Sequence, residues 1–134
     1  MSVIRNPAAV KSFVREKLGC HCPDSVFEQI DYQEHSAVLG HDMNTKRLLI
    51  GNRLLIYILE SNDEQSLPTL LPLLVKKARE ERDYQGYQRL RVVLITDEAE
   101  SLRAQMEKLF ASIEEVDEKV HLHVLDKNQW VDVD

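Results

Sequence analysis

Residues 46–59 read Lys46-Arg47-Leu48-Leu49-Ile50-Gly51-Asn52-Arg53-Leu54-Leu55-Ile56-Tyr57-Ile58-Leu59, and this stretch decides the fold. Apolar residues dominate both halves of it, and Gly51-Asn52 between them is typical of a two-residue turn that needs positive φ. The stretch therefore predicts a β-hairpin. Its second arm is apolar at successive positions, which indicates a strand that is covered on both faces.

Helices and further strands are predicted on both sides of the hairpin from the spacing of apolar residues. The first helix is expected between an N-cap at Asn6 and a left-handed residue at Gly19. The other expected elements are a short helix over 23–30, a short strand over 37–39, a helix from Thr69 to Gly86 with Pro72 in its first turn, a strand over 91–95, a helix capped by Thr96 or Asp97, and a strand over 119–125.

This order of elements predicts an α/β fold. We expect a single-domain sandwich, with a mixed, mostly parallel four-stranded sheet and helices on both faces, and a fifth strand if residues 37–39 pair with the sheet. Three strands, starting near Arg53, Leu90 and Val120, are expected to run parallel through right-handed crossovers. At 134 residues the chain is expected to be one domain over 1–134, with 126–134 as a C-terminal tail.

Composition argues against several classes of protein. The formal net charge is −6, which repels phosphate backbones, so we expect no nucleic-acid binding. Basic residues over 76–82 alternate with acidic ones, which is typical of a solvated helix face. The sequence shows no signal-peptide core and no apolar run long enough to cross a bilayer, so we expect no membrane association. The two cysteines are too close together for a disulfide framework, and we expect a cytoplasmic protein with reduced thiols.

Both cysteines lie in Gly19-Cys20-His21-Cys22-Pro23-Asp24, where one helix is expected to end and another turn to begin. Backbone N–H groups at a helix N-terminus stabilise a thiolate, and Cys22 takes that place. Cys20 is suited to resolve a sulfenic acid or a mixed disulfide formed there. Each cysteine also has a structural explanation. Cys20 packs behind the C-cap glycine, and Cys22 is a small buried hydrophobe or a cap.

A resemblance to a known family rests on the same residues. Leu18-Gly19-Cys20-His21-Cys22-Pro23, followed by Val26-Phe27 and Gly51-Asn52-Arg53-Leu54, resembles a family of small uncharacterised prokaryotic α/β proteins. That family carries a Leu-Gly-Cys-x-Cys-Pro segment in its N-terminal third. The resemblance implies an α/β fold and no particular activity.

Metal binding is a second use of the cysteine segment. Two thiolates and two imidazoles make a ligand set that suits zinc or another transition metal. The candidate ligands are Cys20, Cys22, His21, His121 and His123, with His35 and His41 as alternatives. The spacing of the two cysteines is shorter than in standard zinc motifs. Alternation over 119–125 also explains two of the histidines, as solvent-side residues of a strand whose other residues face inward.

Acidic residues follow three of the expected strands, over 60–64, 96–98 and 126–128. The carboxyl ends of parallel strands share one edge of a sheet, so these residues suggest a Mg²⁺ and phosphate site. Helix capping explains most of them equally well, and no glycine-rich loop accompanies them. No catalytic template is recognisable, so we assign no catalytic residue and no cofactor-binding residue.

The sequence therefore leaves two functions open. The first is a small cytoplasmic protein that acts in thiol redox chemistry or metal handling through Cys20-His21-Cys22, with Cys22 as the reactive or ligating sulfur. The alternative is a non-catalytic protein-interaction module with structural cysteines. In that case another protein, or a second copy of the chain, is expected to pair with a sheet edge at Lys46 to Ile50.

Overall fold

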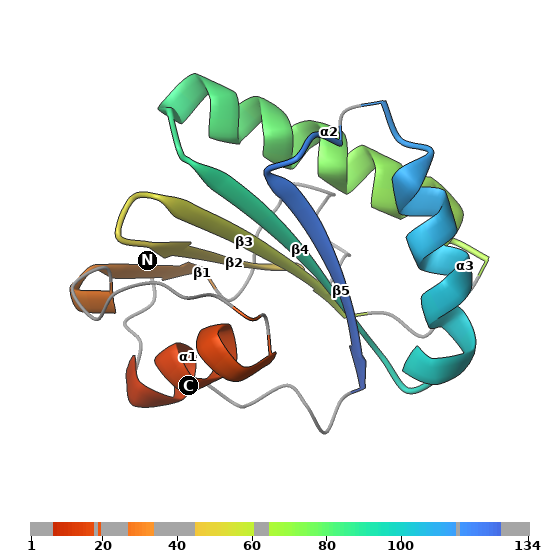
Figure 1. Cartoon of the computed structure of the whole chain (residues 1–134), viewed down its shortest axis with the longest axis horizontal. Helices are drawn as coiled ribbons and strands as arrows, with labels where there is room; N and C mark the ends of the chain where they lie inside the picture. Colours follow the sequence, from red (N-terminus) through yellow and green to blue (C-terminus); the bar gives the residue numbers. More distant parts are fainter. Residues whose placement is uncertain are drawn as a thin grey trace.

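The computed structural model describes residues 7–17, 19, 27–33, 45–60, 65–114 and 116–126. They form one five-stranded sheet with the strand order β1-β2-β3-β4-β5, together with three α-helices and a π-helical turn, η1 (Figure 1). The elements are α1 (Pro7–Ser12), η1 (Phe13–Lys17), β1 (Ile30–Gln33), β2 (Thr45–Ile50), β3 (Leu54–Glu60), α2 (Leu67–Gln85), β4 (Arg89–Thr96), α3 (Ala99–Ala111) and β5 (Val120–Asp126). The predicted α/β class is confirmed.

The predicted hairpin is present as β2 and β3. Gly51 and Asn52 both have positive φ, 58° and 54°, as a two-residue turn of this kind requires. The turn fixes the register, in which Ile50 faces Leu54 and Arg47 faces Tyr57. Successive residues of β3 are buried from Leu54 to Leu59, so this strand is covered on both faces as its sequence predicts.

The sheet is mixed. β3, β4 and β5 run parallel, which confirms the three parallel strands expected from the sequence. β1 and β2 are antiparallel neighbours, and β2 is antiparallel to β3. Two of the four described strand pairs are therefore parallel, and a mostly parallel sheet is not confirmed. Lys46 to Ile50 lies inside the sheet, because β1 pairs with Arg47 to Ile50, so the prediction of an edge there is wrong.

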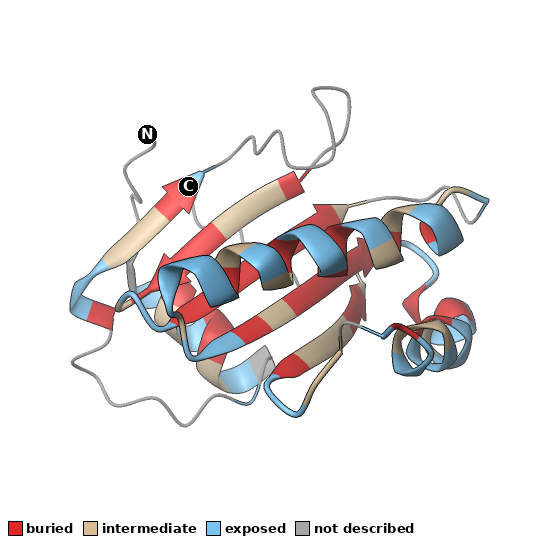
Figure 2. Ribbon diagram, turned by 90° about the horizontal axis from the view of Figure 1, so that it is seen from above, coloured by how far each residue is buried: buried red, intermediate tan, exposed pale blue. Residues whose placement is uncertain are grey.

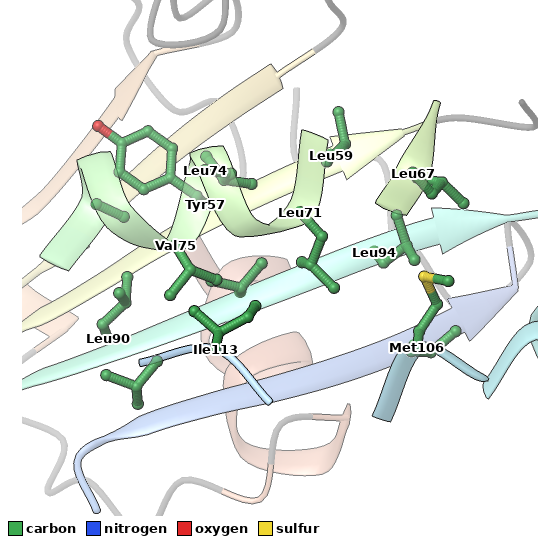
Figure 3. Packing of buried hydrophobic residues seen from close by; sticks show 14 of the residues in the cluster. Tyr57, Leu59, Leu67, Leu71, Leu74, Val75, Leu90, Leu94, Met106 and Ile113 are labelled. Atoms are coloured by element: carbon green, nitrogen blue, oxygen red, sulfur yellow. The ribbon is translucent and has the colours of Figure 1, made fainter. Parts of the chain in front are cut away.

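One large apolar cluster lies between the sheet and the two long helices. Side chains from alternate positions of β3 and β4 meet one face of α2, whose opposite face is exposed (Figure 2). Leu67, Leu71, Leu74, Val75 and Ala78 of α2 are fully buried there (Figure 3). Each large apolar side chain buried in this way contributes about 1.5–3 kcal/mol, so this cluster is the main source of stability.

A second apolar cluster lies on the other side of the sheet, where Figure 1 places α1. Val10, Phe13 and Val14 of α1 and η1 are buried in it, as their spacing predicts. From the sheet come the residues that alternate with those of the first cluster, among them Val93 and Leu125. The helix that carries these residues is α-helical only to Ser12 and continues as a π-helical turn to Lys17.

Two predicted elements differ from the structure. Ile30, predicted to end a helix over 23–30, begins strand β1, and Asp31, predicted to lie in a loop, continues it, because Ile30–Gln33 pairs with β2 and buries Tyr32 in the second cluster. Helix α2 begins at Leu67, so Pro72 lies inside the helix and not in its first turn. Asp126, predicted to begin the C-terminal tail, is the last residue of β5. The strand predicted over 37–39, the cap at Asn6 and the rest of the tail, 127–134, lie outside the described residues. Within the described part of the chain, no helix has the length and apolarity needed to span a membrane.

Candidate functional site

The cysteine segment begins where the first helix stops. Gly19 has a φ of 69°, so the left-handed residue that the sequence predicts just past the helix is confirmed. Cys20, His21 and Cys22 lie outside the described residues, as do His35 and His41. The structure therefore describes the residues on either side of this segment.

Arg15 and Phe27, which lie on either side of the cysteine segment in the sequence, contact each other. The guanidinium carbon of Arg15 lies 5.4 Å from the centre of the Phe27 ring, within the range of a cation–π contact. Phe27 is buried in the second cluster together with Val14, the residue that precedes Arg15. Arg15 and Phe27, on either side of the segment, therefore lie close together, and Arg15 brings a positive charge next to Phe27.

His121 and His123 lie on β5 and face the same side of the sheet as α1. Val120, Leu122 and Val124 pack on the α2 side, as predicted, so the two histidines occupy the alternate positions. Neither is fully exposed, and both are partly buried beside β4. Their description as solvent-side residues is therefore wrong, because the neighbouring strand brings other side chains against them.

Those side chains are arginines. Arg91 is the register partner of His121, and Arg89 precedes it on the same face of β4. We call Arg89, Arg91, His121 and His123 the imidazole–guanidinium cluster. Its most direct contact joins Arg91 Nη1 to His123 Nε2, which are 2.8 Å apart. A guanidinium has no acceptor, so Arg91 donates and Nε2 is the unprotonated nitrogen of a neutral imidazole.

The electrostatics of the cluster agree with a neutral imidazole at His123. Burial, then the charge of Arg91 and then His121, lowers the pKa of His123 to about 4. Burial, followed by Arg91 and Arg89, also lowers the pKa of His121. Burial and the charge of Arg89 lower the pKa of Arg91. Among the described residues, two guanidinium groups therefore act on these imidazoles, while the charge of Asp117 acts on His121 in the opposite direction.

This geometry bears on the candidate metal ligands. The lone pair with which His123 Nε2 would bind a metal is already directed at Arg91. No group of three or more potential ligands from histidine, cysteine, aspartate and glutamate occurs within the described ranges. The structure brings His121 and His123 together on one face, and their distance from Cys20 and Cys22 is not described.

Thr96 and Asp126, at the carboxyl ends of β4 and β5, accept hydrogen bonds around the start of α3, whose N-cap residue is Glu98 and not Thr96 or Asp97 as predicted. Asp126 Oδ1 accepts from the Ala99 backbone N–H at 3.3 Å, at the first residue of α3. Thr96 is buried, and its Oγ1 accepts from the Glu98 backbone N–H at 3.3 Å. Both oxygens satisfy N–H groups that a helix start leaves unpaired. The capping explanation therefore accounts for Thr96 and Asp126, whereas 61–64 and 127–128 lie outside the described residues.

Sequence reasoning missed a polar contact between the sheet and α2. Arg47 of β2 and Tyr57 of β3 both donate to the carboxylate of Glu81, which projects from α2. Tyr57 is buried, and its hydroxyl lies at the margin of the first cluster (Figure 3). Burial, then the bond to Glu81, raises the pKa of Tyr57. The predicted hairpin places Arg47 opposite Tyr57, but no feature of the sequence near these residues predicts that Glu81 contacts them.

A second missed contact ties the end of α2 to the segment before β5. Arg82 Nη1 and Nη2 donate to the two carboxylate oxygens of Asp117 at 3.1 and 2.7 Å. Arg82 also donates to Asp83, and Asp117 accepts from the Lys119 backbone N–H at 2.8 Å. The side chain of Arg82 is only 7% exposed, so the prediction that residues 76–82 form a solvated helix face is wrong for Arg82. Lys76 and Lys77 are exposed, as predicted.

Comparisons with family models, with curated proteins and with solved structures find no match for this chain. The function must therefore be argued from the residues described above.

Proposed function

We propose that this chain is a cytoplasmic thiol protein whose Cys20-His21-Cys22 segment acts in redox chemistry or metal handling. Cys22 is the reactive or ligating sulfur, Cys20 is its partner, and His21 is a local base or a further ligand. The proposal is supported chiefly by the contact of Arg15 with Phe27, which places a guanidinium beside the first described residue after the segment. A nearby cation stabilises a thiolate and lowers the pKa of its thiol.

The left-handed Gly19 adds support, because it stops the helix one residue before Cys20. Segments that follow the end of a helix on a packed scaffold are where reactive residues are commonly found. In the metal version of the proposal the zinc-type ligands are Cys20, Cys22 and His21. His121 and His123 belong to it only if Arg91 releases His123.

Thiol reactivity tests the proposal. The rate of alkylation by iodoacetamide is measured against pH for the wild-type protein and for the Cys20→Ser and Cys22→Ser variants. We expect Cys22 to react with an apparent pKa below the usual ~8.5 of a free thiol. Arg15→Gln should move that pKa upward, whereas Lys77→Gln, an exposed lysine on α2, is the charge-matched control and should leave it unchanged.

Metal analysis completes the test. Protein purified without oxygen is assayed for zinc, iron and copper, and the Cys22→Ser variant is assayed beside it. The proposal fails if neither cysteine reacts faster than a free thiol and the wild-type protein also carries none of these metals.

A protein-interaction module remains a second candidate function, with β5 as the sheet edge in place of Lys46 to Ile50. Among the described strands, β1 and β5 are the outer ones, and β5 is the longer. Arg103 Nη2 donates to the Val124 backbone C=O at 3.0 Å, so part of the outer side of β5 is already covered. In a parallel ladder the Leu122 backbone points to the same side as that of Val124, where a partner strand can pair. Light scattering and a pull-down test this candidate, and a strict monomer that retains no partner contradicts it.

A further inference from the structure

The imidazole–guanidinium cluster has a composition that the thiol proposal does not explain. Its four residues lie at the N-terminal parts of β4 and β5, on the side of the sheet opposite α2 and α3. Arg91 and the two histidines are partly buried, whereas Arg89 is exposed at the rim. Burial, and then the repulsion between two guanidinium groups on one face, lowers the pKa of Arg91.

The contact of Arg91 with His123 shows how this guanidinium is held. A neutral imidazole that accepts from Nη1 fixes the orientation of the guanidinium and, unlike a carboxylate, leaves its positive charge in place. His123 is therefore suited to position Arg91. His121 is the register partner of Arg91. The ring of His121 therefore lies beside the Arg91 guanidinium and offers a further N–H donor on the same face.

We propose that the imidazole–guanidinium cluster is a binding site for a small anion that carries a carboxylate or a phosphate group. Arg91 supplies the principal charge, Arg89 adds charge at the rim, His121 donates a hydrogen bond, and His123 positions Arg91. The planar fork of a guanidinium matches the spacing of oxygens in both kinds of group. Partial burial strengthens the attraction, because charges interact more strongly where water is partly excluded.

Titration calorimetry with the full chain tests this site, with inorganic phosphate and succinate as probes at constant ionic strength. We expect saturable binding of one anion per chain, and the tighter probe identifies the preferred group. Arg91→Gln should weaken binding by about tenfold or more, which is the scale of one charge-assisted, bidentate contact. Lys77→Gln removes the same charge from an exposed site on α2 and should leave the affinity unchanged.

Two further variants keep the test decisive if Arg91→Gln does not fold. Arg91→Lys keeps the charge and loses the fork, so its affinity should lie between those of the wild type and Arg91→Gln. Arg89→Gln alters an exposed side chain and should weaken binding by roughly threefold, since an exposed charge contributes less. In the wild-type protein, the ring signals of His121 and His123 should shift with the same saturation curve.

The proposal is overturned if neither anion binds saturably, or if Lys77→Gln weakens binding as much as Arg91→Gln does. It is also overturned if binding leaves both imidazole rings unperturbed. None of these outcomes depends on thiol reactivity or on metal content, so this site and the thiol proposal fail or hold separately.

Discussion

Replacing Asp117 by asparagine should destabilise the fold more than the same exchange at the more exposed Asp83. Asp117 accepts two hydrogen bonds from Arg82, whose guanidinium is nearly buried at the end of α2. Asparagine keeps the size and one acceptor oxygen, so the bond from the Lys119 backbone N–H can survive. The variant therefore removes the charge and half of the bidentate contact with little change in packing.

The magnitude follows from the pKa of Asp117. Its hydrogen bonds with Arg82 lower that pKa from 3.8 to about 2, in spite of partial burial. That lowering of the pKa corresponds to roughly 2 kcal/mol of stability at neutral pH. The carboxylate is 33% exposed and Asp83 still binds Arg82 in the variant, so solvent screening reduces our expectation to about 1–2 kcal/mol.

Urea unfolding at pH 7 measures this loss. For a chain of this size an m-value of about 1.5 kcal/mol/M converts the expected loss into a midpoint shift of ~1 M, with the slope unchanged. The matched control is Asp83→Asn, which removes the same charge from a 55% exposed side chain and should cost less than about 0.5 kcal/mol. Equal midpoints for the two variants would refute the reasoning.

The same pair predicts a pH dependence with a definite sign. The folded-state pKa of Asp117 lies below its unfolded value, so its stabilisation is complete above about pH 5 and is lost as the pH falls toward 2. The stabilities of wild type and Asp117→Asn should therefore converge between pH 5 and pH 2. A constant difference over that range would contradict the assignment.

Two smaller predictions concern α2. Tyr57→Phe deletes the hydroxyl that donates to Glu81 and should cost about 1 kcal/mol by urea unfolding, whereas Tyr84→Phe, on an 87% exposed side chain, should cost nothing measurable. Gly86 ends α2 with a φ of 77°, and an added Cβ would meet no atom within 4 Å. Gly86→Ala should therefore cost about 1 kcal/mol for backbone strain alone, and Gly86→Asn less, because asparagine adopts this conformation more readily.

Local sequence patterns predicted the parts of the fold that depend on neighbouring residues. The turn at Gly51-Asn52 set the hairpin and its register, so the pairing of Arg47 with Tyr57 followed by counting outward. Continuous apolar runs identified β3 and β4, and the position of Gly19 marked the end of the first helix. Each of these signals lies within a few residues of the structure that it predicts.

Features that depend on distant partners were not predictable in the same way. Residues 30–33 alternate over only four positions, and their pairing with β2 across the intervening segment decides that they form a strand. In the sequence, Arg82 looks like one charge of a solvated helix. Its burial is explained only by its contact with Asp117, which comes much later in the chain. The neighbours of His121 could not be predicted from the sequence for the same reason, because Arg91 lies beside His121 only through the parallel pairing of β4 with β5.

The two sides of the sheet therefore differ in their chemistry. On the α2 side, polar contacts such as Tyr57 with Glu81 lie at the margin of a continuous apolar cluster and fasten a helix, which is a structural role. On the α1 side, Arg15 contacts the ring of Phe27, and Arg91 Nη1 donates to a neutral His123. Both proposals of function draw on these two contacts. The α1 side is thus where function should be sought first, and the anion titrations and the Arg15→Gln alkylation profile examine it from two independent directions.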